Sequence, residues 1–517
     1  MINRRDFLKV TGVGVAFVSL GGFAGAEESV AGKKPNILLI MSDEHNSGIL
    51  GCYGNKIVKT VNLDSLSKNG ITFDACYTNS PLCVPSRESF VSGKYISRYG
   101  VWSNSSELPN DDVSSVPHLL NAAGYESFLC GKMHLQSGRH YGYTEIGDDN
   151  EHHKSGKVGR MDPDLKPVKK LSNRFEKFYA GDDSPIIAHD TWVTEKTIDF
   201  LKNRKAGGKP FFLTVGYHAP HFPLIVPQAY FNAYKDKVPM PNIPEGYLDS
   251  LPRNYKALRN GFSMEKVPDD IVKKGRELYY GLTQWLDEEV GKVLGALKDS
   301  VLAENTIIIY TTDHGENMGE HGLWWKNCVY DSAARIPLIV SWPGKWKGGQ
   351  RRAGACSLVD VASTIVDMGG GKTPGDWDGT SMIKWMDDSS SSWKDMAISE
   401  YYSHCITSGY VMIRKGSLKY TYHTPADDKH PAEKELYDLA KDPGEFKNLA
   451  GDLEYKDKVA ELHDALLKEM CEHPDDTEKR CRAEGAKGYP DAGGGGKKQK
   501  KNRKKGKKGS GSETGNE

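Results

Sequence analysis

Three runs of consecutive apolar residues stand out along the chain, and polar residues bound each run. They read PNILLIMSDEHN at 35–46, KPFFLTVGYHAP at 209–220 and NTIIIYTTDHGEN at 305–317. A strand whose two faces are both covered reads as such a run, because neither face meets water. The pattern therefore predicts three central strands of a parallel sheet.

Helical patterns lie between these strands. They are VNLDSLSKNG at 61–70, VPHLLNAAGY at 116–125 and KKGRELYYGLTQWLDEEVGKVLGALKDS at 273–300. Strands that alternate with helices indicate a doubly wound α/β domain with helices on both faces of the sheet. In such sheets, ligands gather at the carboxyl ends of the strands.

Polar and titratable residues follow all three predicted strands. They are Asp43, Glu44 and His45 after the first, His218 and His221 after the second, and Asp313 and His314 after the third. One such group would be a capped strand end. Three groups at the same edge of a sheet indicate one polar site.

The character of the chain changes after the serine-rich stretch SSSSW that begins at Ser389. Short alternating segments, AISEYY, GYVMIRKGSLKYTYH and KELYDLAKDP, precede a helical pattern, YKDKVAELHDALLKEMCEH. We expect a main domain over 34–388 and a smaller α+β subdomain over 389–484. The glycine- and lysine-rich residues 485–517 are expected to be disordered.

The first 26 residues have the order of a signal peptide. Arg4 and Arg5 precede a weakly apolar stretch from Val10 to Phe23 and the small residues Ala24, Gly25 and Ala26, and NRRDFLK resembles the twin-arginine type. The alternative is a membrane anchor, but the stretch is shorter than the roughly 20 residues that a span needs. We expect cleaved export to the periplasm or the medium.

Composition narrows the function classes. The chain of 517 residues is 38% hydrophobic and 27% charged, with no net charge, as in a soluble globular protein. The basic excess sits in the last thirty or so residues, so the rest is acidic and needs no nucleic acid partner. Nine cysteines without a CxxC pair argue against a structural zinc site.

The stretch PLCVPSRESFVSGKY at 81–95 holds the most specific chemistry. Pro85 suits the first turn of a helix, so Cys83 is expected at a helix N-terminus, where the backbone favours an anion. Arg87 lies at i+4 on the same face, and Gly93 closes the helix. Spacing alone leaves a second interpretation equally open, namely a buried structural cysteine.

C-V-P-S-R followed by S-G-K resembles the motif of the type I sulfatases, in the alkaline phosphatase superfamily. Further stretches are similar to that family between Pro35 and Glu472: GKMHL at 131–135, HAPHFP at 218–223, the block TTDHGENMGEHGLWWKNCVYDSAARIPLIV at 311–340 and ELYDLAKDPGEFKNLA. Within the family, the Cys83 region looks similar to the branch that contains choline sulfatase and carbohydrate sulfatases. The resemblance implies a large doubly wound mixed sheet with a C-terminal subdomain.

The resemblance also implies that Cys83 is oxidised to formylglycine (3-oxoalanine), whose hydrate is the nucleophile. The partner would be a formylglycine-generating enzyme or an anaerobic sulfatase-maturating enzyme. The metal ligands would be Asp43, Glu44, Asp313, His314 and the modified Cys83, around Ca²⁺ or less specifically Mg²⁺. The family more often has an aspartate or an amide where this chain has Glu44.

By the same resemblance, Arg87 holds the formylglycine, Lys132 and Lys326 contact the sulfate, and His134 is the base that expels it. His221 would be the general acid, since histidine titrates near neutral pH. If GKMHL is a strand, Lys132 and His134 project from one face. Taken alone, Lys326 beside two tryptophans also fits a surface lysine. No catalytic role is expected for His218 or His45.

The expected function is an exported sulfuric ester hydrolase that releases sulfate from a sulfated carbohydrate. The alternatives are a choline-sulfate or aryl sulfate hydrolase, a phosphodiester or phosphonate monoester hydrolase using the same site, and a non-catalytic polyanion-binding protein. The basic tail is either an anchor for an anionic polysaccharide or a solvated extension.

Overall fold

The structure is a computed structural model that describes residues 34–147, 152–153 and 159–487. The signal peptide expected over 1–26, and the tail beyond 487, lie outside these residues. No helix within the described ranges is long and apolar enough to cross a membrane.

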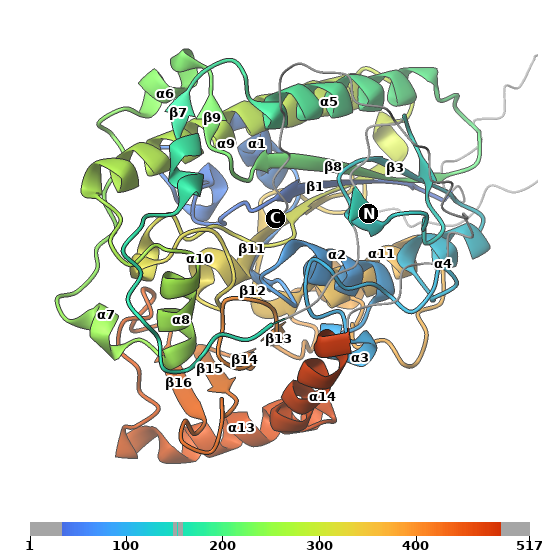
Figure 1. The fold of residues 1–517 in the computed structure, drawn as a ribbon. Coiled ribbons are helices and arrows are strands. Elements are labelled where there is room, and N and C mark those ends of the chain that lie inside the picture. Colours follow the sequence, from blue (N-terminus) through green and yellow to red (C-terminus); the bar gives the residue numbers. More distant parts are fainter. Residues whose placement is uncertain (1–33, 148–151, 154–158, 488–517) are drawn as a thin grey trace, which may run out of the picture. The chain divides into compact units, whose positions relative to one another are not determined.

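An eight-stranded sheet forms the centre of the fold (Figure 1). Its order is β12 (Gln350–Ser357), β2 (Ile71–Tyr77), β11 (Arg335–Ser341), β10 (Thr306–Thr312), β1 (Asn36–Asp43), β8 (Phe211–Pro220), β3 (Glu126–Gly131) and β5 (Thr144–Glu145). Only β11 runs against its neighbours. The three strands predicted from apolar runs, β10, β1 and β8, lie side by side at its centre and are parallel, which confirms the mixed α/β sheet.

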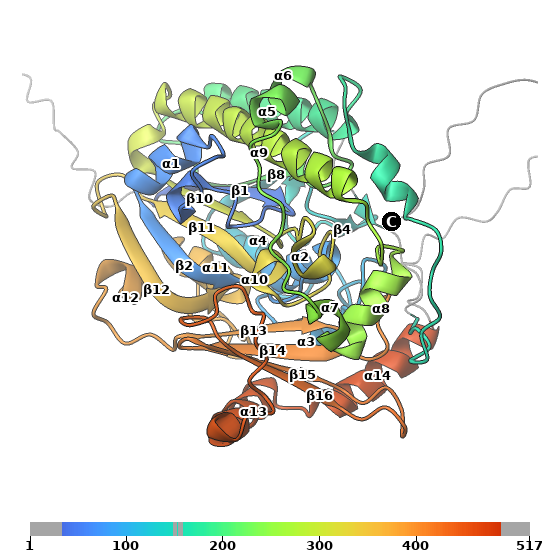
Figure 2. The same cartoon turned by 90° about the vertical axis from the view of Figure 1, so that its left-hand side faces the viewer.

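Helices cover both faces of this sheet, as Figures 1 and 2 show. One face carries α1 (Val61–Lys68), α5 (Pro185–Asn203) and α9 (Asp269–Lys298), and the other carries α2 (Cys83–Ser92), α4 (Val116–Ala122) and α11 (Leu358–Met368). Side chains of strand β1 pack against the helices on both faces of the sheet. Leu38 and Ile40 join one hydrophobic cluster, whereas Leu39 and Met41 join the other. Alternate residues of a strand point to opposite faces, so a strand with two buried faces has to be apolar throughout.

A second sheet of four antiparallel strands lies in the C-terminal part of the chain. It consists of β13 (Met396–Tyr401), β14 (Tyr410–Lys415), β15 (Leu418–His423) and β16 (Glu433–Asp438), and α13 (Lys456–Met470) packs against it (Figure 2). The last helix, α14 (Pro474–Lys487), has no counterpart among the predicted elements. Its sequence is mostly polar, and ion pairs such as Arg160 to Glu478 at 2.7 Å tie it to the fold.

Short elements complete the chain. They are the strand pairs β4 (Leu135–Gln136) with β6 (His152–His153) and β7 (Tyr179–Ala180) with β9 (Ile225–Val226), the helices α3 (Ile96–Tyr99), α6 (Gln228–Tyr234), α7 (Tyr247–Ser250), α8 (Arg253–Gly261), α10 (Asp331–Ala334) and α12 (Ile383–Asp387), and the 3-10 turns η1 (Gly51–Tyr53), η2 (Asn173–Lys177), η3 (Ala303–Asn305), η4 (Glu320–Gly322) and η5 (Leu453–Tyr455).

The segment GKMHL is not a strand. β3 ends at Gly131, and the chain turns before β4 begins at Leu135. Gly131 has φ 89°, and His134 has φ 55°, so neither residue is extended. Two backbones also come unusually close here, because a Cβ atom on Gly216 would lie 1.8 Å from the carbonyl oxygen of Lys132. The expectation that Lys132 and His134 share one face of a strand is therefore wrong.

We expect Gly216→Ala to destabilise the protein, because the added methyl group meets rigid backbone that cannot move aside. Overpacking of this kind costs about 1–3 kcal/mol. Gly295→Ala is the matched control, since a Cβ atom at Gly295 in α9 meets nothing within 4 Å. It should raise stability by up to about 1 kcal/mol. Urea unfolding of both variants measures this, and equal stabilities would contradict the close approach.

Candidate active site

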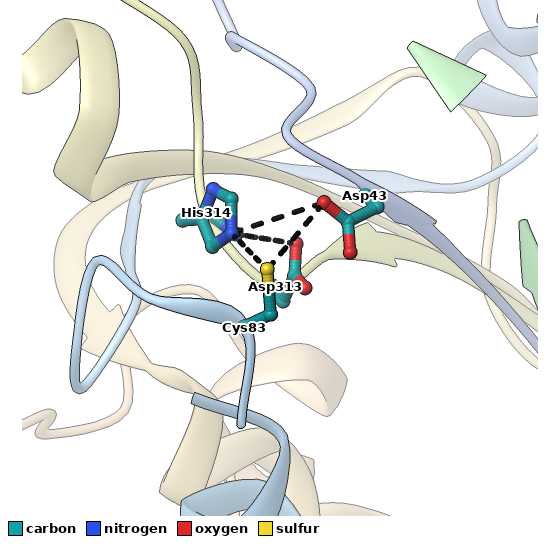
Figure 3. A group of neighbouring side chains, drawn as sticks. All are labelled: Asp43, Cys83, Asp313 and His314. Carbon is teal, nitrogen blue, oxygen red and sulfur yellow. Dashed lines mark hydrogen bonds and ion pairs between the residues drawn. The ribbon is translucent and has the colours of Figure 1, made fainter. Parts of the chain in front are cut away.

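The carboxyl ends of two central strands meet the N-terminus of α2. Asp43 ends β1, Asp313 and His314 follow β10, and Cys83 is the first residue of α2. Figure 3 shows the four side chains pointing toward one another. The Cys83 Sγ lies 3.3 Å from His314 Nε2 and 3.9 Å from Asp43 Oδ1. The sequence prediction that these strand ends form one site is borne out in space.

Arg87 joins the two aspartates. Its Nε donates to Asp313 Oδ2 at 2.7 Å, and its Nη2 donates to Asp43 Oδ2 at 3.1 Å. All three side chains are fully buried. Burial raises the pKa of Asp43, but Lys132 and the other cations around it outweigh burial and hold that pKa well below its usual range. Both aspartates are thus ion-paired beneath the site.

The Cys83 thiol faces two more of the predicted catalytic residues. Lys326 Nζ lies 3.1 Å from Cys83 Sγ and 2.7 Å from His221 Nε2. Burial, with Asp43 adding to it, raises the pKa of the Cys83 thiol well above its usual value. The thiolate is the nucleophilic form of cysteine, so the helix N-terminus does not make Cys83 an activated thiol here.

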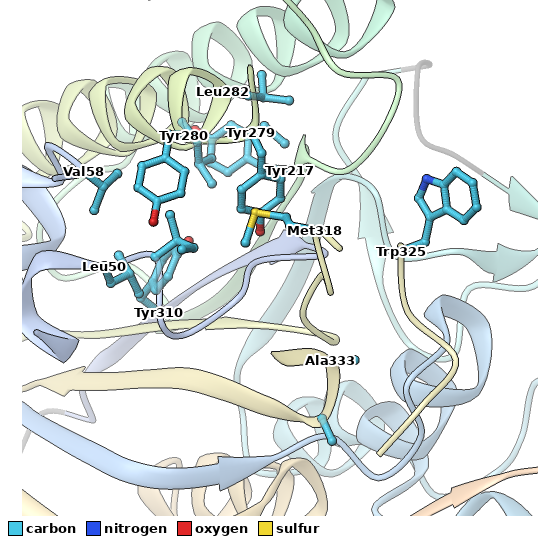
Figure 4. Close-up of a cluster of buried hydrophobic side chains, with 14 of the residues drawn as sticks. Leu50, Val58, Tyr217, Tyr279, Tyr280, Leu282, Tyr310, Met318, Trp325 and Ala333 are labelled. Carbon is cyan, nitrogen blue, oxygen red and sulfur yellow. The ribbon is translucent and has the colours of Figure 1, made fainter. Parts of the chain in front are cut away.

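Glu44 lies next to the group of four, on its His221 side. Its Oε2 lies 3.1 Å from His221 Nε2 and 3.6 Å from Lys326 Nζ, so it forms a second group with Asp43 and His221. Glu44 has φ 63°. Tyr279 of α9, which Figure 4 shows among the buried tyrosines, holds this turn, because its hydroxyl donates to the Glu44 carbonyl at 2.6 Å. Burial raises the pKa of the Glu44 carboxyl well above its usual value.

Lys132 reaches the site from the turn after β3, and His134 lies in the same turn. Lys132 Nζ lies 3.1 Å from Asp43 Oδ2, and both side chains are buried. The Lys132 backbone N–H donates to the Gly216 carbonyl at 2.9 Å, which fixes the turn to β8. His134 lies two residues further on and is 5% exposed.

Lys326 is buried, so the alternative of a surface lysine does not hold. It lies between two residues in the left-handed region, Trp325 with φ 61° and Asn327 with φ 80°. The Trp325 N–H donates to Glu316 Oε1 at 2.6 Å, and the Asn327 N–H donates to the Pro81 carbonyl at 3.1 Å. These two bonds fix the Lys326 backbone beside the start of α2.

Sequence reasoning missed two supporting carboxylates. Asp190 of α5 accepts hydrogen bonds from the backbone N–H groups of His218 and Ala219 at 2.9 and 2.8 Å, and so holds the loop that carries His221. Nothing in the helical pattern of α5 marks it. Glu316 accepts the hydrogen bond from the Trp325 N–H. Its position three residues after Asp313, within the block at 311–340, was enough to mark it as a candidate.

The two remaining histidines have structural contacts. His45 Nδ1 lies 2.6 Å from the hydroxyl of Tyr310, and the His218 ring packs at a tilt against the His189 ring with centroids 4.2 Å apart. That neither residue is catalytic stays a prediction.

The donor set suits a divalent cation. One ligand atom each from Asp43, Cys83, Asp313 and His314 lies within 4.8 Å of the other three. Burial lowers the pKa of His314 to about 4, which leaves the imidazole neutral, as a metal ligand must be. The buried Glu44 carboxylate lies next to this set and shares a second group with Asp43 and His221. A cation would balance part of the negative charge of these carboxylates.

Comparison with family models gives two matches. A model described as Sulfatase matches residues 35–371, and a model described as N-sulphoglucosamine sulphohydrolase, C-terminal, matches residues 319–472. Together they span the stretch over which the sequence motifs lie.

Individual proteins with known names or solved structures are also similar to this chain. An arylsulfatase of Clostridium perfringens is 28% identical over 466 residues, covering 84% of this chain and 94% of the relative. An N-acetylglucosamine-6-O-sulfatase of Bacteroides thetaiotaomicron is 27% identical, with 89% and 90% covered. The solved structure of a phosphonate monoester hydrolase of Agrobacterium radiobacter superposes with a TM-score of 0.69 at 21% identity, over 84% of this chain and 95% of that one. The last likeness shows a shared fold.

Arg87→Met should destabilise the protein by about 3–5 kcal/mol, because it leaves two buried carboxylates without their shared counter-ion. The control is Arg351→Met, which breaks the ion pair of a half-exposed arginine with Asp74 and should cost no more than about 1 kcal/mol. Thermal and urea unfolding measure both. A cost for Arg87→Met as small as that of the control would contradict the role of Arg87 as the central ion pair.

Proposed function

The chain belongs to the sulfatase family and is a sulfuric ester hydrolase, and on this premise we propose that it is exported and releases inorganic sulfate from a sulfated carbohydrate. The signal-like N-terminus supports export to the periplasm or the medium, and the similarity to an N-acetylglucosamine-6-O-sulfatase supports a sugar substrate. The lysine-rich tail would hold the enzyme on an anionic polysaccharide.

The observation that carries the proposal is the setting of Cys83. Its thiol lies against Lys326 and His314, yet burial keeps it in the unreactive protonated form. A maturation enzyme that oxidises the Cys83 side chain to an aldehyde would turn it into a nucleophile. The aldehyde hydrate offers one hydroxyl for attack on sulfur and a second whose deprotonation expels sulfate and restores the aldehyde.

We assign a divalent cation to the group of Asp43, Asp313 and His314 with the modified Cys83. Glu44, which shares a second group of possible ligands with Asp43 and His221, would complete the set through its carboxylate. The carboxylates favour Ca²⁺, and Mg²⁺ less specifically. When bound, the cation offsets the charge that develops on the sulfate oxygens.

The remaining residues have distinct tasks. Lys132 and Lys326 bind the sulfate oxygens, and Arg87 keeps the nucleophile and both aspartates in register. His221 Nε2, next to Lys326, gives a proton to the leaving alcohol oxygen. His134 accepts the proton of the second hydroxyl of the hydrate. Both histidines are buried, so water has little access to either proton transfer.

The same site could serve a phosphodiester or a phosphonate monoester, as the fold shared with a phosphonate monoester hydrolase suggests. The enzyme should hydrolyse 4-nitrophenyl sulfate with a higher kcat/KM than bis(4-nitrophenyl) phosphate. A higher kcat/KM for bis(4-nitrophenyl) phosphate would show that the substrate class is a phosphodiester and not a sulfate ester.

Active enzyme should carry an aldehyde or its hydrate at position 83, which peptide mass spectrometry across residues 81–95 detects. Cys83→Ala should lower kcat by at least about a thousandfold, because it removes the nucleophile. Cys130→Ala is the control, since Cys130 is equally buried but lies in the hydrophobic core, with its thiol directed at the Val193 carbonyl. A fully active enzyme with an unmodified Cys83 would refute this nucleophile.

Removal of the cation should abolish turnover. Dialysis against a chelator should leave a folded, inactive protein, and Ca²⁺ should restore activity. His314→Ala should raise the Ca²⁺ concentration that half-restores activity by about tenfold or more, as expected for the loss of one ligand. Elemental analysis checks the metal content. Full activity in a preparation shown to be metal-free would rule out the cation.

A further inference from the structure

Arg174 is a cation without a counter-ion near the active site. It lies in η2, and its guanidinium carbon is 4.6 Å from the ring centre of Phe222, 4.9 Å from Trp325 and 5.3 Å from Phe262. The side chain is half-buried. In the described part of the chain, no carboxylate lies within ion-pair distance of this guanidinium, and no hydrogen bond satisfies it.

Arg204, an arginine with only a structural role, has aromatic surroundings like those of Arg174. Its guanidinium also lies on three aromatic rings, those of Phe200, Phe128 and Phe211, at 5.3, 5.4 and 5.7 Å. Glu126, however, pairs with it at 2.7 Å. The two sites share the same aromatic packing and differ in the neutralising carboxylate, so packing alone does not explain why Arg174 is left unpaired.

The aromatic rings under Arg174 connect it directly to the catalytic residues. Phe222 follows His221 in sequence, and the two rings stack with centroids 4.9 Å apart. Trp325 precedes Lys326, and Figure 4 shows it set apart from the tyrosine cluster around Tyr279. Arg174 therefore lies on the His221 side of the site, where the leaving alcohol, that is the rest of the sugar, has to be.

The surroundings of Arg174 are also positive. The segment 166–177 carries five lysines and arginines against one glutamate. The Ser172 N–H donates to the Ser263 carbonyl at 3.0 Å, which joins this segment to the loop of Phe262. A cavity of about 370 Å³ between them is lined by Lys169, Lys170 and Lys266 and by one carboxylate, Glu265. The three lysines outnumber this carboxylate, and an excess of positive charge attracts anionic ligands.

Cation–π packing occupies the faces of the three rings and the flat face of the guanidinium, and leaves the N–H edge of the arginine for other partners. That edge is a rigid fork which matches a carboxylate or a sulfate with two parallel hydrogen bonds. The guanidinium carbon lies within 5.3 Å of all three ring centres, so a ligand that approaches these rings also meets a positive charge. This charge favours an anionic sugar over a neutral one.

We propose that Arg174 binds a second anionic group of the substrate, a carboxylate or a further sulfate, on the sugar that carries the scissile sulfate or on its neighbour. This inference rests on the proposed sulfatase function and narrows its substrate class to sugars with at least two negative charges. Arg174 is then a specificity-determining residue of the site.

The test compares three substrates: 4-nitrophenyl sulfate, a hexosamine with two sulfates, and a monosulfated disaccharide that contains a uronate. For Arg174→Met, the ratio of kcat/KM on the better doubly charged sugar to kcat/KM on 4-nitrophenyl sulfate should fall about tenfold or more. One charge-assisted hydrogen bond supplies a factor of this size. The loss should appear mainly in KM, and Arg174→Lys should retain part of the ratio.

Arg204→Met is the matched control and should leave the ratio unchanged. The sugar that loses more identifies the second group as sulfate or carboxylate. An unchanged ratio in a folded Arg174→Met protein, or an equal fall in the control, would overturn the inference while the sulfatase function stands. If wild-type enzyme hydrolysed none of the sulfate esters, the proposed function itself would fail first.

Discussion

The ion pairs of Arg87 with Asp43 and Asp313 are the constraint on which the rest of the structure depends. The two aspartates end neighbouring parallel strands, and like charges so close together in a dry interior would repel one another. One guanidinium from α2 bridges the two, with hydrogen bonds of 3.1 and 2.7 Å, and Lys132 adds a second positive charge beside Asp43. Because Arg87 lies one helical turn after Cys83, the same bonds set the position of Cys83 against the strand ends.

Several residues around this ion pair have a strained backbone conformation. Glu44, His134, Trp325 and Asn327 all have φ between 55° and 80°, a conformation that costs residues with a Cβ atom about 1–3 kcal/mol. This backbone conformation persists because contacts with neighbouring residues hold it. Tyr279 fixes the Glu44 turn, and Glu316 fixes the Trp325 turn. The strained turns let strand ends and loops aim several polar side chains at one point, which regular strands cannot do.

Burial has opposite consequences for the nucleophile and for the substrate. Burial keeps the Cys83 thiol protonated. The unmodified side chain is therefore unreactive, although the positive charges of Lys326 and Lys132 lie close to it. The same low dielectric strengthens those cations toward a sulfate ester. Outside the closed centre, Arg174 keeps an unneutralised charge on aromatic rings, so the two regions of positive charge would act on different parts of one substrate.

The central strands, the helix that begins at Cys83 and the strand-end residues Asp43, Asp313 and His314 could be predicted from the amino-acid sequence. These features follow from local periodicity and from short motifs, because a run of apolar residues indicates a buried strand. The folded arrangement was needed to find that Glu44 turns toward His221, that GKMHL bends at Gly131, that Asp190 holds the loop of His221 and that Arg174 lies on the rings of Phe222 and Trp325. Each of these depends on contacts between residues far apart in the chain, such as Asp190 with His218 or Arg174 with Trp325. A local sequence pattern does not specify such contacts, because they arise only where separate helices, strands and loops pack together.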